Sequence, residues 1–187
     1  QLIRYLLENE HTSPFEHVVF TFHARMPIFV ARQWVRHRTA RLNEISGRYS
    51  VLPEDYYIPE RSRIRTQDET DHQSSSDKEL PPEKQAEAIG IIESSAGESY
   101  RHYQKLLDMG VAREVARVVL PLNMYTEWYW QMDLHNLFHF LKLRLDAHAQ
   151  WEIRQYARAM AKIVEKIVPI SFEAFADFVL TPRDIEY

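Results

Sequence analysis

Hydrophobic side chains follow two periodicities along the chain, and each predicts a different kind of element. Spacings of three and four residues predict helices, whereas runs of β-branched and aromatic residues predict strands. The predicted helices cover residues 1–10, 27–37, 82–109, 111–120, 134–143, 147–168 and 172–180. The predicted strands cover His17–Arg25 and Asn123–Met132, and residues 42–50 are expected to be irregular and then extended. The fold class is therefore predicted to be α+β, a mainly helical single domain over residues 1–187 with a small antiparallel sheet.

Residues with special backbone preferences mark several element ends. Pro14 biases the residue before it away from helical geometry and ends the first helix. Gly110 favours a helix stop, and Pro121 ends the short helix that follows. The carboxylate of Asp146 is expected to cap the helix over 147–168.

The segment from Glu60 to Lys84 has no hydrophobic periodicity. Its only large aliphatic residues are Ile64 and Leu80, and serines 74–76 lie among charged residues. Such a composition buries too little apolar surface to fix one conformation. We expect a flexible surface loop over 60–84.

The composition narrows the class of protein. The chain has 187 residues and no cysteine, which excludes disulfides, thiolate metal ligands and a cysteine nucleophile, and fits a cytoplasmic protein. Its formal net charge of −4 disfavours nucleic-acid binding, which relies on a basic surface. No apolar run approaches the length of a membrane span, and the first residues lack the organisation of a signal peptide. We therefore expect neither nucleic acid nor membrane among the partners.

Positive charge is nevertheless concentrated in one segment. Between Arg32 and Arg48 there are five arginines and one histidine against a single acid, Glu44. Guanidinium groups match phosphate oxygens and stay charged when partly desolvated, so a phosphorylated ligand is the natural candidate. The interleaved polar residues supply the donors and acceptors that a small-molecule site needs. A solvated basic face, paired with acids elsewhere, is the alternative.

A second group of polar residues surrounds two histidines. His135 and His139 lie four residues apart and share one helical face, a spacing common in zinc sites. No glutamate lies between them as a general base, and Arg144 would oppose a metal charge. A helix break near 143–146 would let Arg144 turn into the cleft of His139. Ordinary core or surface histidines remain an equal alternative.

Two further segments have simple structural explanations. Glu114 and Arg117 are three residues apart, and from spacing alone a local helix pair is the favoured interpretation. A phosphate-binding role for Arg117 is the functional alternative. The hydroxyl and imidazole groups between His11 and His17 could line a site, but turn chemistry beside a proline also explains them.

Together these segments resemble the flavin-dependent thymidylate synthase (ThyX) family. The signature is R-H-R-x7-S from Arg36 to Ser46, within a run that continues as N-E-I-S-G-R-Y-S to Ser50. The other matching segments, in the family's order, are S-P-F-E-H from residue 13, A-R-Q-W from 31, E-V-A-R-x-V-L-P from 114 and L-R-x-D-x-H-A-Q-W-E from 143.

The resemblance implies that family's fold and the reductive methylation of dUMP to dTMP. Methylenetetrahydrofolate would donate the carbon, FAD would carry the hydride and NADPH would reduce the flavin. The lack of cysteine agrees with this route, because hydride from reduced flavin makes a protein nucleophile unnecessary. The resemblance also implies a homotetramer with active sites shared between subunits. Family members usually carry an N-terminal strand before the helix that starts here at Gln1, so we expect that strand to be missing.

The resemblance assigns site residues motif by motif, and none of them to a metal. The flavin set is His11, Ser13, Arg36, His37, Arg38, Thr39, Glu44, Asp133, His135 and His139. The dUMP set is Gln33, Glu44, Ser46, Gly47, Arg48, Arg117 and Arg144. Arg144 is the implied catalytic residue, since a fixed guanidinium in a water-poor cleft stabilises uracil ionised at N3.

Two other functions fit the same residues less completely. The runner-up is a His/Asp metal-dependent nucleotide phosphohydrolase, based on His135 and His139. The third is a noncatalytic nucleotide-binding module. A flavin absorbance spectrum that NADPH bleaches would favour the flavin-dependent thymidylate synthase over both of these functions.

Overall fold

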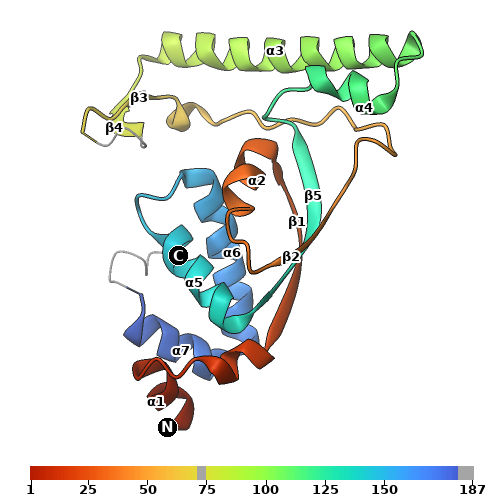
Figure 1. Cartoon of the computed structure of the whole chain (residues 1–187). Helices are drawn as coiled ribbons and strands as arrows, with labels where there is room; N and C mark the ends of the chain where they lie inside the picture. The colour runs from red at the N-terminus through yellow and green to blue at the C-terminus, as the bar shows by residue number, and fades with distance from the viewer. Residues whose placement is uncertain (71–74, 181–187) are drawn as a thin grey trace. The chain divides into compact units, whose positions relative to one another are not determined.

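The computed structural model describes residues 1–70 and 75–180 and confirms the predicted fold class. The α-helices are α1 (Leu2–Glu8), α2 (Ile28–Trp34), α3 (Pro82–Asp108), α4 (Arg113–Ala116), α5 (Leu134–Leu145), α6 (Trp151–Ile167) and α7 (Pro169–Phe178) (Figure 1). The strands are β1 (Val19–Pro27), β2 (Arg41–Glu44), β3 (Arg65–Gln67), β4 (Ser75–Glu79) and β5 (Tyr125–Asp133). Three short 3-10 helices are η1 (Ser13–His17), η2 (Arg61–Arg63) and η3 (Arg117–Val119). Strands β1, β5 and β2 form one sheet in that order, and β3 and β4 form another.

Contacts divide the chain into two compact units. Unit 1 comprises Gln1–Ala24, Gln33–Asn43 and the chain from Tyr129 onward, and unit 2 comprises Arg25–Arg32 and Glu44–Trp128. Four elements, namely β1, α2, β2 and β5, begin in one unit and end in the other. The single domain over 1–187 stays a prediction.

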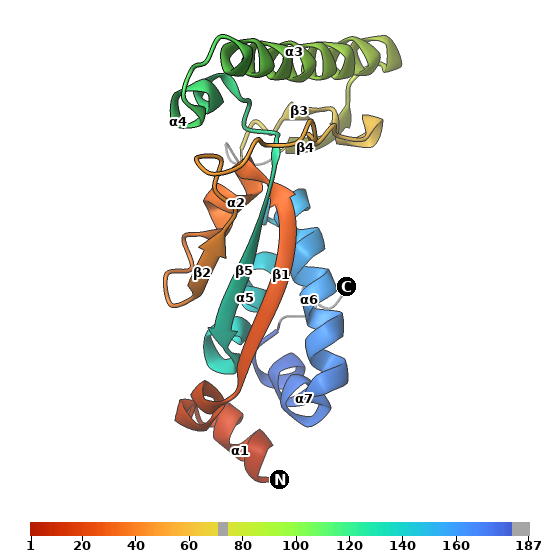
Figure 2. The ribbon, with the colours of Figure 1, turned by 90° about the vertical axis from the view of Figure 1, so that its right-hand side faces the viewer.

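Aromatic side chains form the core of unit 1. Trp34 packs edge-on against Trp130, with 5.5 Å between ring centroids, and stacks on Phe140 at 5.3 Å. Phe138 of α5 stacks on Phe175 of α7 at 4.3 Å. Helix α6 lies alongside α5 and meets α7 (Figure 2), so α5 is fixed from several sides. A rigid α5 matters because it carries three of the predicted site residues.

Unit 2 is organised by the long helix α3, whose predicted bounds, 82–109, agree closely with the structure. Tyr100 and Tyr103 of α3 are buried in a cluster with Ala116 and Met124. The Tyr100 hydroxyl donates to the carbonyl of Leu52 at 3.0 Å, and the Leu52 amide donates to the Tyr103 hydroxyl at 3.2 Å. These two bonds attach the chain just after the arginine-rich segment to α3.

Three sequence predictions are wrong in detail. Helix α2 ends at Trp34, so Arg36 and His37 lie in a turn and not on a helix. Between residues 42 and 50 the extended part comes first, as β2, and the turns follow. Asp146 does not cap the next helix: α6 starts at Trp151, and the Asp146 carboxylate instead accepts from the backbone amide of His148 at 2.7 Å.

The stretch from 60 to 84, expected to be a loop, contains regular structure in its described part. Strands β3 and β4 pair antiparallel, with Arg65 opposite Glu79, and the hydroxyl oxygens of Thr66 and Ser76 lie 2.6 Å apart. This pairing uses polar side chains, which a pattern of apolar residues does not reveal. Residues 71–74 lie outside the described residues.

Among the described residues, every helix is too short or too polar to cross a membrane.

Candidate functional site

The turn after α2 and the last turn of α5 meet through two predicted site residues. Nε of Arg144 donates a hydrogen bond to Nε2 of His37 at 3.0 Å. The His37 ring also packs edge-on against Phe140 at 4.8 Å and against His139 at 6.4 Å, measured between centroids. Helix α5 ends at Leu145, within the break expected near 143–146, but Arg144 still lies on the helix and does not turn at the break. His37 comes to Arg144 instead.

Burial shifts the pKa values of both partners. Burial, followed by the charges of Arg144 and His139, lowers the pKa of His37 to about 4 from an ordinary value of 6.5. Burial also lowers the pKa of Arg144, although guanidinium groups stay protonated throughout the physiological range. The pair at neutral pH is therefore a neutral imidazole accepting from a guanidinium.

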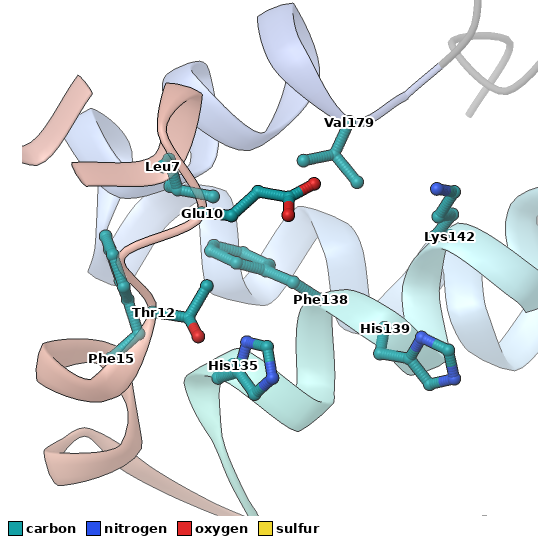
Figure 3. A pocket seen from close by; sticks show the side chains of 9 residues that line it. All are labelled: Leu7, Glu10, Thr12, Phe15, His135, Phe138, His139, Lys142 and Val179. Carbon is teal, nitrogen blue, oxygen red and sulfur yellow. The ribbon is translucent and has the colours of Figure 1, made fainter. Parts of the chain in front are cut away.

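A cavity of about 350 Å³ lies beside α5 in unit 1 (Figure 3). His135, His139 and Lys142 reach it from α5, whereas Glu10 and Thr12 come from the link after α1. Its floor is apolar, being formed by Leu7, Phe15, Phe138 and Val179. The two histidines proposed from sequence thus share one cavity, with Thr12 between His11 and Ser13 on its edge.

The remaining residues of the flavin set have different surroundings. His11 is exposed and packs edge-on against Tyr5 at 6.2 Å, and Ser13 is exposed at the start of η1. Arg36, Arg38 and Thr39 are exposed in the turn after α2. In the described part of the chain neither arginine forms an ion pair, which leaves both guanidinium groups available to an anionic ligand.

Asp133 has a structural role at the start of α5. It is the N-cap of α5, and its Oδ1 accepts from the Asn136 amide at 2.9 Å. The Asn136 side chain also donates to both carboxylate oxygens, at 3.0 and 2.8 Å. A flavin contact by Asp133 stays a prediction.

The histidine pair is not part of a metal-ligand cluster. Within residues 1–70 and 75–180, no three His, Asp or Glu side chains are grouped so that they could hold a metal ion.

Gln33 of the dUMP set lies at the end of a chain of side-chain hydrogen bonds in unit 1. Its Nε2 donates to Oε1 of Gln150, and Nε2 of Gln150 donates to the carboxylate of Glu152 at 2.8 Å. Because a carboxylate only accepts, Glu152 fixes the direction of both amides. The Oε1 atom of Gln33 takes no part in this chain of bonds.

Apart from Arg144, the other residues of the dUMP set belong to unit 2. Oε1 of Glu44 accepts from the hydroxyl of Thr126 at 2.6 Å, and the Ser46 hydroxyl accepts from the Arg48 amide at 3.3 Å. Gly47 is buried, and a methyl group there would lie 3.4 Å from Cδ of Arg117. The second half of the arginine-rich segment therefore lies against η3.

The local pair between Glu114 and Arg117 does not form. Glu114 instead pairs with Arg48 at 3.1 Å, and both side chains are about half exposed. An exposed pair of this kind contributes little to stability. The favoured explanation of Glu114 and Arg117 from spacing alone was wrong, and the Arg117 guanidinium is exposed.

Sequence reasoning missed two residues that touch the predicted set. Thr126 is buried on β5, on the same face as Trp128 and Trp130. It is the one polar residue among these three buried positions. That mismatch was a detectable signal. Gln150 belongs to the L-R-x-D-x-H-A-Q-W-E motif, but no local pattern indicates its contact with Gln33, which is 117 positions away.

A family model described as "Thymidylate synthase complementing protein" matches residues 1–170. A flavin-dependent thymidylate synthase of Treponema denticola is 56% identical over 174 residues, which are 93% of this chain and 65% of the relative. One of Thermus thermophilus is 57% identical over 179 residues, or 96% of this chain and 64% of the relative. The chain belongs to the flavin-dependent thymidylate synthase family.

Solved structures agree with this family assignment. The UMP/dUMP methylase PolB of Streptomyces cacaoi, bound with 5-Br dUMP, has a TM-score of 0.85 at 36% identity, with 97% of this chain and 80% of that chain covered. Its complex with 5-Br UMP has a TM-score of 0.88 at 35% identity, with 97% and 83% covered. The chain spans 65% and 64% of the length of the two flavin-dependent thymidylate synthases above.

Proposed function

We propose that this chain carries out the reductive methylation of dUMP to dTMP, with methylenetetrahydrofolate as carbon donor, FAD as hydride carrier and NADPH as reductant. One observation carries the proposal: the fold joins His37 of the R-H-R motif to Arg144 of the L-R-x-D motif, 107 residues away. Two related proteins bear the name of this enzyme, and a structural relative is a dUMP methylase.

The residues of unit 1 suit a flavin. Arg36 and Arg38 offer exposed guanidinium groups for phosphate oxygens. The cavity beside His135 and His139 combines an apolar floor with imidazole donors and acceptors, as an aromatic ring with polar edges requires. These residues would hold the FAD with His11, Ser13 and Thr39. When bound, reduced flavin supplies the hydride, which a side chain cannot do.

The residues of unit 2 suit a nucleotide monophosphate. Arg48 and Arg117 would meet the phosphate as bidentate forks, with Ser46 and the backbone at Gly47 beside them. Glu44, oriented by Thr126, offers an acceptor to hydroxyl or N–H groups of dUMP. Gln33, in unit 1, offers a second acceptor.

Arg144 is the proposed catalytic residue. Its guanidinium is half-buried, and burial strengthens its attraction for an anion. It would stabilise uracil that has lost the N3 proton and so raise the electron density of the ring at the carbon to be methylated. A homotetramer in the cytoplasm is part of the proposal. Large apolar side chains that are exposed in unit 2, such as Tyr49, Val118 and Leu122, support such an assembly.

Two measurements test the proposal. The purified protein should show an oxidised-flavin spectrum that NADPH bleaches, and should form dTMP from dUMP and methylenetetrahydrofolate. Arg144→Ala should abolish dTMP formation with flavin content unchanged, whereas the matched control Arg101→Ala, on the exposed side of α3, should keep full turnover. A colourless, zinc-containing protein that hydrolyses dUMP would instead establish the phosphohydrolase.

A further inference from the structure

The hydrogen bond between Arg144 and His37 restricts the chemical form of the histidine. Nε2 of an imidazole accepts a hydrogen bond only when it carries no proton, so the donor Nε–H of Arg144 requires neutral His37 with its proton on Nδ1. The surroundings favour this neutral form, since burial and the neighbouring charge lower the pKa of His37 to about 4. The charged and titratable groups packed against the ring are Arg144 and His139, both from α5.

The same contact restricts the guanidinium. A guanidinium is planar with five N–H donors, and His37 uses the one on Nε. The four terminal N–H groups then remain for a ligand. Phe140 and Arg144 are four residues apart on α5 and so share one helical face. The His37 ring lies across both, with its centroid 4.8 Å from that of Phe140.

We propose that His37 is a positioning residue for Arg144, which orients the guanidinium through Nε so that its terminal N–H pair faces the substrate. This inference rests on the proposed function. It gives the histidine of the R-H-R motif a task in catalysis that differs from a direct contact with the flavin. Its remaining N–H, on Nδ1, can still meet another group.

A pair of substitutions separates positioning from packing. Glutamine places Oε1 close to the position of Nε2 and accepts the same N–H, whereas leucine fills the space and accepts nothing. We expect His37→Leu to lower kcat about 100-fold with flavin content and dUMP affinity little changed, and His37→Gln to stay within about tenfold of the wild type. His102→Gln, exposed on α3, is the matched control and should keep wild-type kcat.

A double-mutant cycle tests whether the effect passes through Arg144. In an Arg144→Lys background, where the guanidinium is absent, His37→Leu should lower kcat by no more than about twofold. If the double variant instead lost kcat by the product of the two single-variant factors, the proposal would be overturned. So would a glutamine variant no better than leucine, or a leucine variant that loses flavin in proportion to activity.

One readout does not depend on turnover. Nitrogen-15 NMR of the wild-type protein at pH 7 should show His37 neutral and protonated on Nδ1, and the Arg144 Nε–H resonance should shift in His37→Leu. A wild-type protein without dTMP synthesis would refute the proposed function, while these spectra would still report on the pair. A proton on Nε2 of His37 would refute the positioning role by itself.

Discussion

Gly47 lies against the aliphatic stem of Arg117: a methyl group on the glycine would stand 3.4 Å from the Arg117 Cδ atom and 3.0 Å from Cδ1 of Leu52. Both neighbours are side-chain atoms. An alanine fits only if Leu52 shifts by a few tenths of an ångström, whereas the Arg117 stem would be in van der Waals contact with the new methyl group. The glycine therefore sets how closely a proposed phosphate ligand approaches the backbone of the arginine-rich segment.

We expect Gly47→Ala to raise the KM for dUMP about three- to tenfold, because the added methyl group crowds the Arg117 stem and the backbone beside which the phosphate is proposed to bind. Stability should change by no more than about 1 kcal/mol, since flexible side-chain ends can yield. The control is Gly90→Ala in α3, where nothing lies within 4 Å. It should leave KM unchanged and stabilise the helix by up to about 1 kcal/mol. Equal KM values in all three proteins would contradict the placement of Arg117.

Removing the Arg117 side chain should affect the substrate more than the fold. The residue is exposed, so Arg117→Ala should cost no more than about 0.5 kcal/mol of unfolding free energy. Loss of a phosphate fork should weaken dUMP binding at least about tenfold, or about 1.4 kcal/mol. Arg117→Lys should recover only part, since lysine lacks the bidentate geometry. Titration of dUMP against the three proteins measures this, and unchanged affinity would remove Arg117 from the site.

Thr126 should act through Glu44. Thr126→Val keeps the buried shape but removes the hydroxyl that donates to the carboxylate at 2.6 Å. We expect dUMP affinity to fall about fivefold, equivalent to one hydrogen bond of about 1 kcal/mol. Thr126→Ser keeps the donor and should bind dUMP like the wild type. A serine variant as weak as valine would show that the methyl group, and not the hydroxyl, matters.

Asp133 offers a test between capping and flavin binding. Asp133→Ala should destabilise the protein by about 1 kcal/mol in urea denaturation, because α5 loses its N-cap. Asp133→Asn keeps a carbonyl acceptor and should retain most of that stability. If asparagine instead loses flavin at unchanged stability, the carboxylate is a ligand of the cofactor.

The lowered pKa of His37 predicts a pH dependence of stability with a definite sign. Between pH 4 and 6.5 the unfolded chain binds a proton on this imidazole that the folded chain excludes, so acid favours unfolding. The stability that His37 contributes by excluding this proton is fully present above pH 6.5 and is lost as the pH falls towards 4. At pH 5 the loss should reach about 2 kcal/mol at most. Urea denaturation at pH 7.5 and 5 should show a smaller decrease for His37→Gln than for the wild type, and equal decreases would contradict the shift.

Local patterns predicted most of the elements, and the failures have physical causes. Residues 82–109 and the strand ending near Met132 were found because their apolar spacing is regular and long. Strands β3 and β4 were not predicted, because their pairing joins polar side chains such as Thr66 and Ser76. Helix α2 was extended too far because Arg36 and His37 continue its spacing although their backbone has turned.

The composition of the site was predictable, but its contacts were not. A motif identifies which residue types the chemistry needs. Local spacing favoured a pair of Arg117 with Glu114, but Glu114 pairs with Arg48 instead. The contact of Arg144 with His37 depends on tertiary structure between positions 107 apart, and no local pattern encodes it. Thr126 lies between these cases, since a polar residue on an apolar strand face marks a position with a buried partner.

Strand β2 carries the boundary between the two halves of the arginine-rich segment, because its residues up to Asn43 belong to unit 1 and Glu44 belongs to unit 2. Successive side chains of a strand point to opposite faces. Inserting or deleting one residue there would reverse the facing of every later strand position, whereas a change of two would preserve it. The seven-residue gap in R-H-R-x7-S therefore fixes which face each later strand residue takes, as well as the distance. Insertions of two residues into the gap should be tolerated better than insertions of one.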